Sequence, residues 1–342
     1  MSNRATRRLS LGVRLHGAEE RVSGLPLLPA PPDPHDYPFH EFLVMELERG
    51  RLDALLVPRL LTAPPGAGNV APGPVFEAAT LLAGFAGAAD GIGVVATAPA
   101  LGGHAGAIAH RLASLDVLSS GRSGWQPELS ENGDLAGNGD DEAGNGDDEP
   151  RRAHAAELLA EIERLWSAGN QGAPDAPPPL PQGRPVLFLT ADTPAERALA
   201  ARHADVVLAA RRPLEQARSW YAETKTRAAT HGRPPEDLLI WTELTPLVVS
   251  DAHQAHAPRT DDVLAGTPGQ IADHIEERFE QRACDGFTLS FPSLPGPLVD
   301  FVDHVIPELW RRGLFPNDYE HPTLRENLGL RHHAIPTGAI HA

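Results

Sequence analysis

One repeating unit of the chain is complete in residues 186–209, VLFLTADTPAERALAARHADVVLA. It begins with the apolar run Val186–Thr190 and ends with a second one, Val206–Ala209, and both have the length of a buried strand. Between them, Pro194–His203 has a helical pattern, and Thr193 before a proline is typical of a helix N-terminus. A strand, a helix and a second buried strand in succession predict two parallel strands.

The same alternation continues in both directions along the chain. Six further strands are predicted at Leu9–Leu15, Ala54–Val57, Ile92–Ala96, Arg122–Trp125, Leu238–Trp241 and Phe287–Phe291. Seven further helices are predicted at His40–Arg49, Glu77–Ala88, Ala105–Leu115, Ala153–Trp166, Pro213–His231, Pro268–Arg282 and Pro297–Arg311. Eight strands separated by helices most economically form a closed parallel (β/α)8, or TIM, barrel. An open doubly wound α/β sheet is the alternative, but Leu11-Gly12-Val13 leads into no glycine-rich phosphate turn.

Composition limits the class of protein. Of the 342 residues, 41% are hydrophobic and 22% are charged, which is enough to build a core. The net charge of −17 argues against binding to nucleic acid or to an anionic membrane. Without a long apolar run, and with a polar start at Met1–Arg8, we expect a cytoplasmic protein. The single cysteine, Cys284, excludes intrachain disulfides, and Lys225 is the only lysine for Schiff-base or P-loop chemistry.

Two segments interrupt the alternation. Ser130–Pro150 holds two copies of Gly-Asn-Gly-Asp-Asp, and this acidic tract offers almost no apolar surface to bury. We expect it to be a poorly ordered loop on the face where barrel enzymes keep their active sites. Ala173–Gln182, with five prolines, is expected to be an extended connector. The domain prediction is a single barrel domain over residues 1–330 followed by a tail at 331–342.

A series of short motifs has a characteristic order. They are Gly121–Trp125, Pro181–Pro185, Ala200–Ala204, Gly266–Asp273, Asp285–Phe287, Leu294–Gly296, Ile306–Leu309, Arg312–Phe315 and Thr323–Gly329. In these motifs, the chain resembles the nitrilotriacetate and dibenzothiophene-sulfone monooxygenase group of the bacterial-luciferase-like flavin-dependent oxidoreductases, from roughly residue 40 to 330. The resemblance implies the same barrel that the periodicity predicts.

The resemblance also implies a cofactor and partners. Members of this group use reduced flavin mononucleotide (FMN), supplied by a separate NAD(P)H-dependent flavin reductase, to activate O2 and oxygenate a small organic substrate. Thr97 matches a threonine whose hydroxyl touches the flavin, and Thr193 takes the place of a serine near the phosphate, at a helix start that favours anions. Each also has a structural interpretation, since Thr97 ends a strand and Thr193 is a good N-cap.

Several positions depart from the pattern of the group. Pro58 stands where a carboxylate is usual, and Gln126 replaces an asparagine. Asp148 and Arg152 replace a histidine and a tyrosine that lie near the flavin in relatives. Arg152 could still pair with a flavin phosphate, with Asp148 as its partner, or both could be solvated charges at a helix start. Thr97, Thr193 and Arg152 are therefore the candidate cofactor-binding residues, and no catalytic residue is assigned.

Other groups lie at the predicted strand ends, where ligands bind in barrel enzymes. Arg211 and Arg212 could hold an anionic substrate or cofactor, or form a solvated pair. His253 and His256 lie between Val249 and Gly266, where relatives carry a long insertion, and their spacing is weak evidence for a metal, so no metal is expected.

The preferred function is a two-component, FMN-dependent monooxygenase. A degenerate, non-catalytic paralogue that serves as a binding or partner protein is the first alternative. A deazaflavin-dependent oxidoreductase, with Arg152 or Arg211 recruited for the more acidic tail of that cofactor, is the second. The substrate is not readable from the sequence, which also leaves open whether the chain forms a homodimer.

Overall fold

The computed structural model describes residues 7–15, 36–58, 60–62, 74–99, 104–128, 148–249 and 263–331. Its central sheet contains β1 (Ser10–Arg14), β2 (Ala54–Val57), β5 (Gly93–Pro99), β6 (Ser123–Glu128), β7 (Val186–Thr190), β8 (Val206–Ala209), β9 (Leu239–Val248) and β11 (Gly286–Leu289). Neighbouring strands are parallel in the order β11-β1-β2-β5-β6-β7-β8-β9, and β9 pairs with both β8 and β11. The sheet is thus closed, and the predicted (β/α)8 barrel is confirmed.

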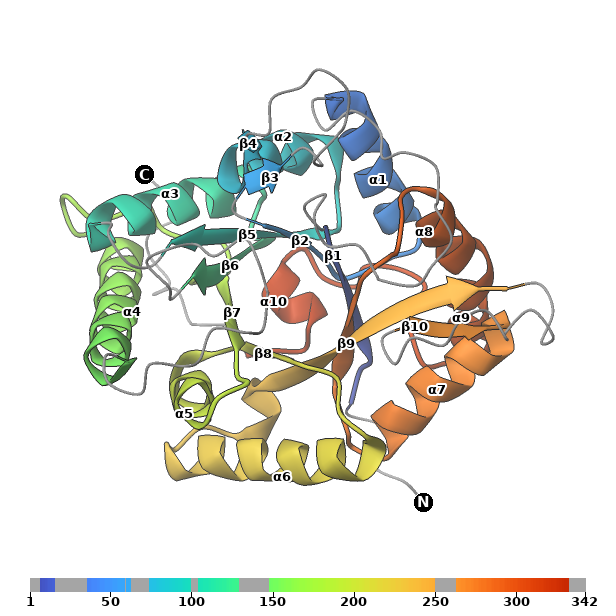
Figure 1. Ribbon diagram of the computed structural model, residues 1–342. Coiled ribbons are helices and arrows are strands. Elements are labelled where there is room, and N and C mark those ends of the chain that lie inside the picture. Colours follow the sequence, from blue (N-terminus) through green and yellow to red (C-terminus); the bar gives the residue numbers. More distant parts are fainter. Residues whose placement is uncertain are drawn as a thin grey trace.

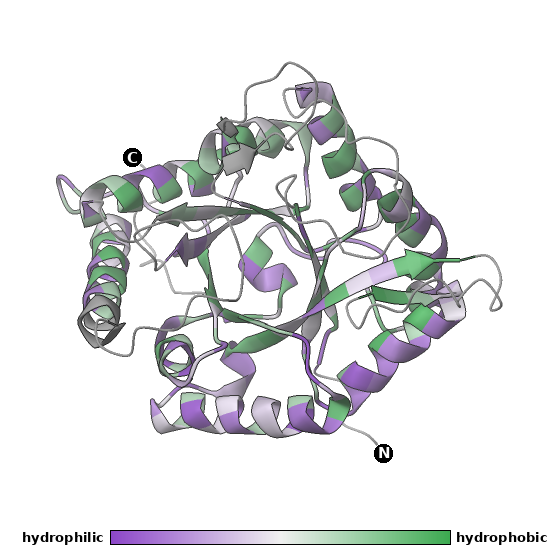
Figure 2. Ribbon diagram, in the orientation of Figure 1, coloured by the Kyte–Doolittle hydropathy of each residue, from purple (hydrophilic) through white to green (hydrophobic). Residues whose placement is uncertain are grey.

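Helices form the outer layer around the strands (Figure 1). They are α1 (Tyr37–Arg49), α2 (Ala78–Ala88), α3 (Ala105–Leu118), α4 (Asp148–Asn170), α5 (Pro194–His203), α6 (Leu214–Thr230), α7 (Pro268–Glu280), α8 (Gly296–Asp300) and α9 (Ile306–Arg311). Hydrophobic residues concentrate on the strands and on the helix faces turned toward them (Figure 2). None of the helices within the described ranges has the length and apolar character that a membrane span requires.

Five apolar residues of the last outer helix recur at spacings of three and four, which predicts that they form its inner face, and the structure confirms this. These residues are all buried: Leu298, Phe301, Val302, Val305 and Leu309. The helix is not uniform, because a π-helical turn, η4 (Phe301–Val305), separates α8 from α9. Pro307 follows in the first turn of α9, and since proline has no backbone N–H it removes one donor from the regular helical ladder.

Three further features are not predicted by the sequence patterns. The strands β3 (Leu60–Thr62) and β4 (Pro74–Glu77) form an antiparallel hairpin after β2, and β10 (Val263–Gly266) pairs with the extended end of β9. Helix α10 (Leu324–Asn327) is seen in the middle of the ring of strands in Figure 1.

Helix α10 closes the barrel at the amino-terminal ends of the strands. Leu324, Leu328 and Leu330 pack in one buried cluster with inward-facing residues of the strands, among them Leu56 and Trp241. A Cβ atom on Gly93, the first residue of β5, would lie 2.5 Å from a methyl carbon of Leu324. This end of the barrel is therefore filled, which leaves the opposite end for a ligand.

The barrel interior alternates large side chains with glycine. A Cβ atom on Gly12 would lie 2.3 Å from the ring of Trp241, so only glycine fits beside this indole. Gly124 makes the same room for Phe188, whose ring centroid lies 5.5 Å from that of Trp241. These contacts establish which strand residues point inward.

Candidate active site at the carboxyl ends of the strands

Polar side chains occupy the inward-facing layer at the carboxyl ends of the strands. Side chains alternate along a strand, so the positions two residues beyond Gly12, Val95, Gly124, Phe188 and Trp241 also face the barrel axis. These positions hold Arg14, Thr97, Gln126, Thr190 and Glu243. The layer below them is mostly apolar. Active sites of (β/α)8 enzymes lie at this end, so this polar layer is the candidate floor of the site.

Thr97 lies in this layer and is 9% exposed. It is in register with Gln126 on the neighbouring strand, and its hydroxyl donates to Oε1 of Gln126 over 3.4 Å. The distance is long for a hydroxyl donor, so this contact is weak. The predicted cofactor-binding residue Thr97 thus lies beside Gln126, the residue that departs from the pattern of the group, and both face the mouth of the barrel.

Thr193 is the exposed N-cap of α5. Its Oγ1 accepts a hydrogen bond from the backbone N–H of Glu196 at 3.3 Å. The Glu196 carboxylate in turn accepts the backbone N–H groups of Thr193 at 2.9 Å and Asp192 at 3.0 Å. This is a complete capping box, in which Thr193 keeps its own hydroxyl hydrogen as the group free to donate outward.

Other predicted positions are only partly described. Asp148 and Arg152 lie in the first turns of α4, but their side chains are outside the described part of the molecule. The acidic tract before Asp148, together with His253 and His256, also lies outside the described residues. Within the ranges that the structure describes, no three His, Cys, Asp or Glu side chains are grouped as a metal site would require.

An ion pair between Arg14 and Glu243, which the sequence patterns do not indicate, links β1 to β9 at the mouth, past the intervening strand β11. Nη1 of Arg14 lies 3.3 Å from Oε1 of Glu243, and the side chains are 25% and 49% exposed. Burial lowers the pKa of Arg14, while Glu243 and Asp192 oppose that shift. The pair joins β1 to β9, 229 residues apart, so no local pattern contains it. The one sequence signal that could have placed Arg14 in the mouth is the alternation of side chains along β1, because Arg14 lies two residues beyond the inward-facing Gly12.

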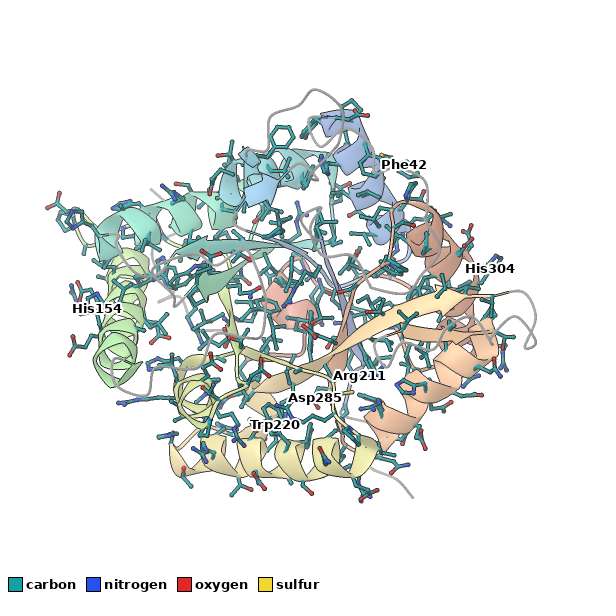
Figure 3. The ribbon with its side chains drawn as sticks, in the orientation of Figure 1. Phe42, His154, Arg211, Trp220, Asp285 and His304 are labelled. Carbon is teal, nitrogen blue, oxygen red and sulfur yellow. The ribbon has the colours of Figure 1, made fainter. Side chains whose placement is uncertain are left out.

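The arginines after β8 are anchored differently from each other. The Arg212 guanidinium lies 4.7 Å from the ring centroid of Trp220, and its Nη1 donates to the carbonyl of Ala210 at 2.8 Å. Trp220 lies on the inner side of α6, whereas Arg211 is exposed (Figure 3). Burial, with Arg278 and Arg211 nearby, lowers the pKa of His274 to about 4. His274 is therefore neutral at pH 7.

The only lysine lies at the opposite end of the barrel. Nζ of Lys225 is 2.8 Å from Oδ2 of Asp285, which precedes β11 and is labelled in Figure 3. The Tyr221 hydroxyl donates to Oδ1 of Asp285 at 2.8 Å. Burial raises the pKa of Asp285, but Lys225 and Arg7 outweigh it and hold that pKa below its usual value. Lys225 thus stabilises the fold at the filled end, away from the candidate site.

Comparison with known proteins identifies the family. The model of the luciferase-like monooxygenase family matches residues 40–286. A pristinamycin IIA synthase polypeptide from Streptomyces pristinaespiralis, one of the subunits of that enzyme, is 32% identical, over 86% of this chain and 89% of that protein. A component of nitrilotriacetate monooxygenase from Aminobacter aminovorans is 26% identical, over 86% and 90%.

A solved structure has the same fold. The EDTA monooxygenase from Chelativorans sp. BNC1 superimposes with a TM-score of 0.78 over 95% of this chain and 99% of that one, at 24% identity. The resemblance that the motifs indicated is therefore confirmed, and the chain belongs to the luciferase-like monooxygenase family.

Proposed function

We propose that the protein is the oxygenating component of a two-component monooxygenase that uses reduced FMN and O2 on a small organic substrate. Family membership supports a monooxygenase, and two relatives, one a synthase subunit and the other a monooxygenase component, bear names that describe one part of a larger system. A separate NAD(P)H-dependent flavin reductase would supply the reduced flavin. The polar layer at the carboxyl ends of the barrel strands is the observation that carries the proposal.

The residues of this layer suit the ring of a flavin. Thr97 and Gln126 present a hydroxyl and an amide on neighbouring strands, and these groups complement the carbonyl and N–H groups of the ring edge. When bound, the reduced flavin would supply the activation of O2. The protein would orient the ring with Thr97 and Gln126.

Thr193 and Arg152 are proposed to lie at the phosphate end of the cofactor. The hydroxyl hydrogen of Thr193 is available there, but the neighbouring backbone amides are already bonded to Glu196. The amide cradle that a phosphate usually finds at a helix start is therefore partly occupied at α5. We also propose that residues 1–330 form one luciferase-like domain.

A flavin titration under anaerobic conditions tests the proposal. Reduced FMN should bind with a micromolar dissociation constant, and oxidised FMN should show a quenched or shifted fluorescence on binding. No binding of any flavin would contradict the proposed function and support the non-catalytic paralogue. In that case, the double variant Asp148→His, Arg152→Tyr should restore measurable binding. A clear preference for a deazaflavin would support the other alternative.

A further inference from the structure

Helix α5 starts at the mouth of the barrel, directly beyond the inward-facing Thr190 of β7. The first backbone N–H groups of a helix have no partner within the helix, and together with the helix dipole they attract anions. A helix start beside an active site is thus the natural place for a phosphate group. Whether the start of α5 can bind a phosphate group depends on whether those N–H groups are free.

Three backbone N–H groups at the start of α5 already have partners. One carboxylate oxygen of Glu196 accepts the N–H groups of Asp192 and Thr193, at 3.0 and 2.9 Å, and the Glu196 N–H donates to Thr193 Oγ1 at 3.3 Å. An internal carboxylate therefore occupies the position that an external anion would take. A phosphate at this place would have to displace it.

The charge around the start of α5 also disfavours an anion. Asp192 is exposed and brings a second carboxylate, whose Oδ1 accepts the N–H of Ala210 at 3.2 Å. Nη2 of Arg212 lies 3.6 Å from this carboxylate, but Arg212 is held by Trp220 and by the Ala210 carbonyl. Glu196 and Asp192 thus bring two carboxylates to the start of α5, and the guanidinium of Arg212, which lies near Asp192, is already engaged, so a phosphate would add to the repulsion.

A second helix shows that the acidic group is not needed for capping. At the start of α7, Thr267 and Gln270 form the same capping box, and Oε1 of Gln270 accepts the Thr267 N–H at 2.9 Å. There the residue is neutral. The negative charge of Glu196 is thus a property of the α5 start and not a requirement of the box.

We propose that Glu196 is a specificity-determining residue that closes the start of α5 to phosphate, so that the protein binds FMN and unphosphorylated riboflavin with nearly equal affinity. The proposal rests on the proposed function, because it requires that a flavin binds at the mouth. The binding free energy then comes from the ring and the sugar chain.

Fluorescence titration of oxidised FMN and riboflavin tests this proposal. For the wild-type protein, the two dissociation constants should agree within about threefold. Glu196→Ala frees two amides and removes a charge, so FMN should bind roughly tenfold more tightly while riboflavin affinity stays unchanged. Glu196→Gln removes the charge but retains the capping group, and it should give a smaller gain for FMN.

The matched control is Gln270→Ala, which opens the corresponding box at α7. It should lower the melting temperature about as much as Glu196→Ala and leave the ratio of the two affinities unchanged. The proposal is overturned if wild-type protein binds FMN more than about tenfold better than riboflavin, or if Glu196→Ala does not move the ratio of the two affinities. If no variant binds either flavin, the proposed function fails, and this proposal fails with it.

Discussion

Thr97 is the residue at which flavin contact and local structure are most easily separated. Its hydroxyl makes one long hydrogen bond to Gln126, so replacing it by the isosteric valine costs the fold little. Thr97→Val should leave flavin affinity within about threefold. It should change the rate at which bound reduced flavin reacts with O2, as followed by stopped-flow absorbance.

The control for this experiment is Thr288 of β11, which is in register with Gly12 of β1. Thr288 is 1% exposed, and no hydrogen-bond partner of its hydroxyl is found among the described residues. Thr288→Val should therefore change neither affinity nor the reaction with O2. An equal effect of both substitutions on the reaction would show that Thr97 acts through the packing of the barrel and not through its hydroxyl.

Lys225 is the only lysine and thus the only residue available for Schiff-base or P-loop chemistry, but its role in the structure is to stabilise the fold. Removing it leaves the buried carboxylate of Asp285 with Arg7 and Tyr221 as its remaining side-chain partners. Lys225→Met should lower the free energy of unfolding by about 3 kcal/mol, because a buried charge loses its closest counter-charge. Urea denaturation measures this loss. A drop in flavin affinity in the folded variant would contradict the placement of Lys225 far from the site.

At the scale of elements, the short helix α10 contributes strongly to the stability of the fold. Leu324 is 1% exposed and fills the space over Gly93 at the closed end of the barrel. Leu324→Ala should lower the free energy of unfolding by about 3 kcal/mol, because the rigid strands around it cannot collapse into the cavity. Urea denaturation measures this change too. The exposed Leu118 is the control, and its substitution by alanine should cost below about 0.5 kcal/mol.

The elements differ in how far the sequence predicts them. Seven of the eight barrel strands are predictable because each is a short apolar run between turns, whereas β6 reads SGWQPE and gives only a weak signal. The inner face of the last helix is predictable because its spacing is regular. Helix α10 has only four residues, too few to show a period. The Arg14–Glu243 pair joins distant strands, and Glu196 is an ordinary helical glutamate until its capping contacts are seen. Such contacts depend on tertiary geometry, which no local pattern contains.

At the scale of the whole molecule, the two ends of the barrel differ in role. The carboxyl ends of the strands carry the candidate site, and the amino-terminal ends carry contacts that stabilise the fold. Buried aspartates just before β2, β8 and β11 each accept a backbone N–H from an adjacent strand: Asp53 from Leu11, Asp205 from Leu187 and Asp285 from Ile240. They fix the strands at the end that α10 fills. Substitutions there should change stability, and substitutions at the mouth should change binding.

Two carboxylates at the filled end should respond to pH in opposite directions. Burial raises the pKa of Asp205, but Arg184 and Arg325 outweigh it and hold the pKa well below the usual value. Burial also raises the pKa of Asp116, and the hydrogen bonds from Ser123 and Gln182 do not reverse this shift. A lowered pKa stabilises the fold above the unfolded value of about 3.9, and a raised pKa destabilises it there.

The opposite signs lead to a paired prediction for asparagine variants. Asp205→Asn removes the partner of two buried arginines, so at pH 7 it should lower the free energy of unfolding by about 3 kcal/mol. The loss should shrink as the pH falls below about 4, where wild-type Asp205 is protonated on unfolding.

Asp116→Asn should behave in the opposite way. It removes a buried charge that has no cationic partner among the described residues, so at pH 8 the variant should be more stable than wild type, by on the order of 1 kcal/mol. The gain should vanish as the pH falls through the raised pKa toward about 4, where wild-type Asp116 is neutral in the folded state too. Urea denaturation at several pH values measures both curves. If Asp116→Asn were destabilising at pH 8, its hydrogen bonds to Ser123 and Gln182 would outweigh the cost of burying its charge.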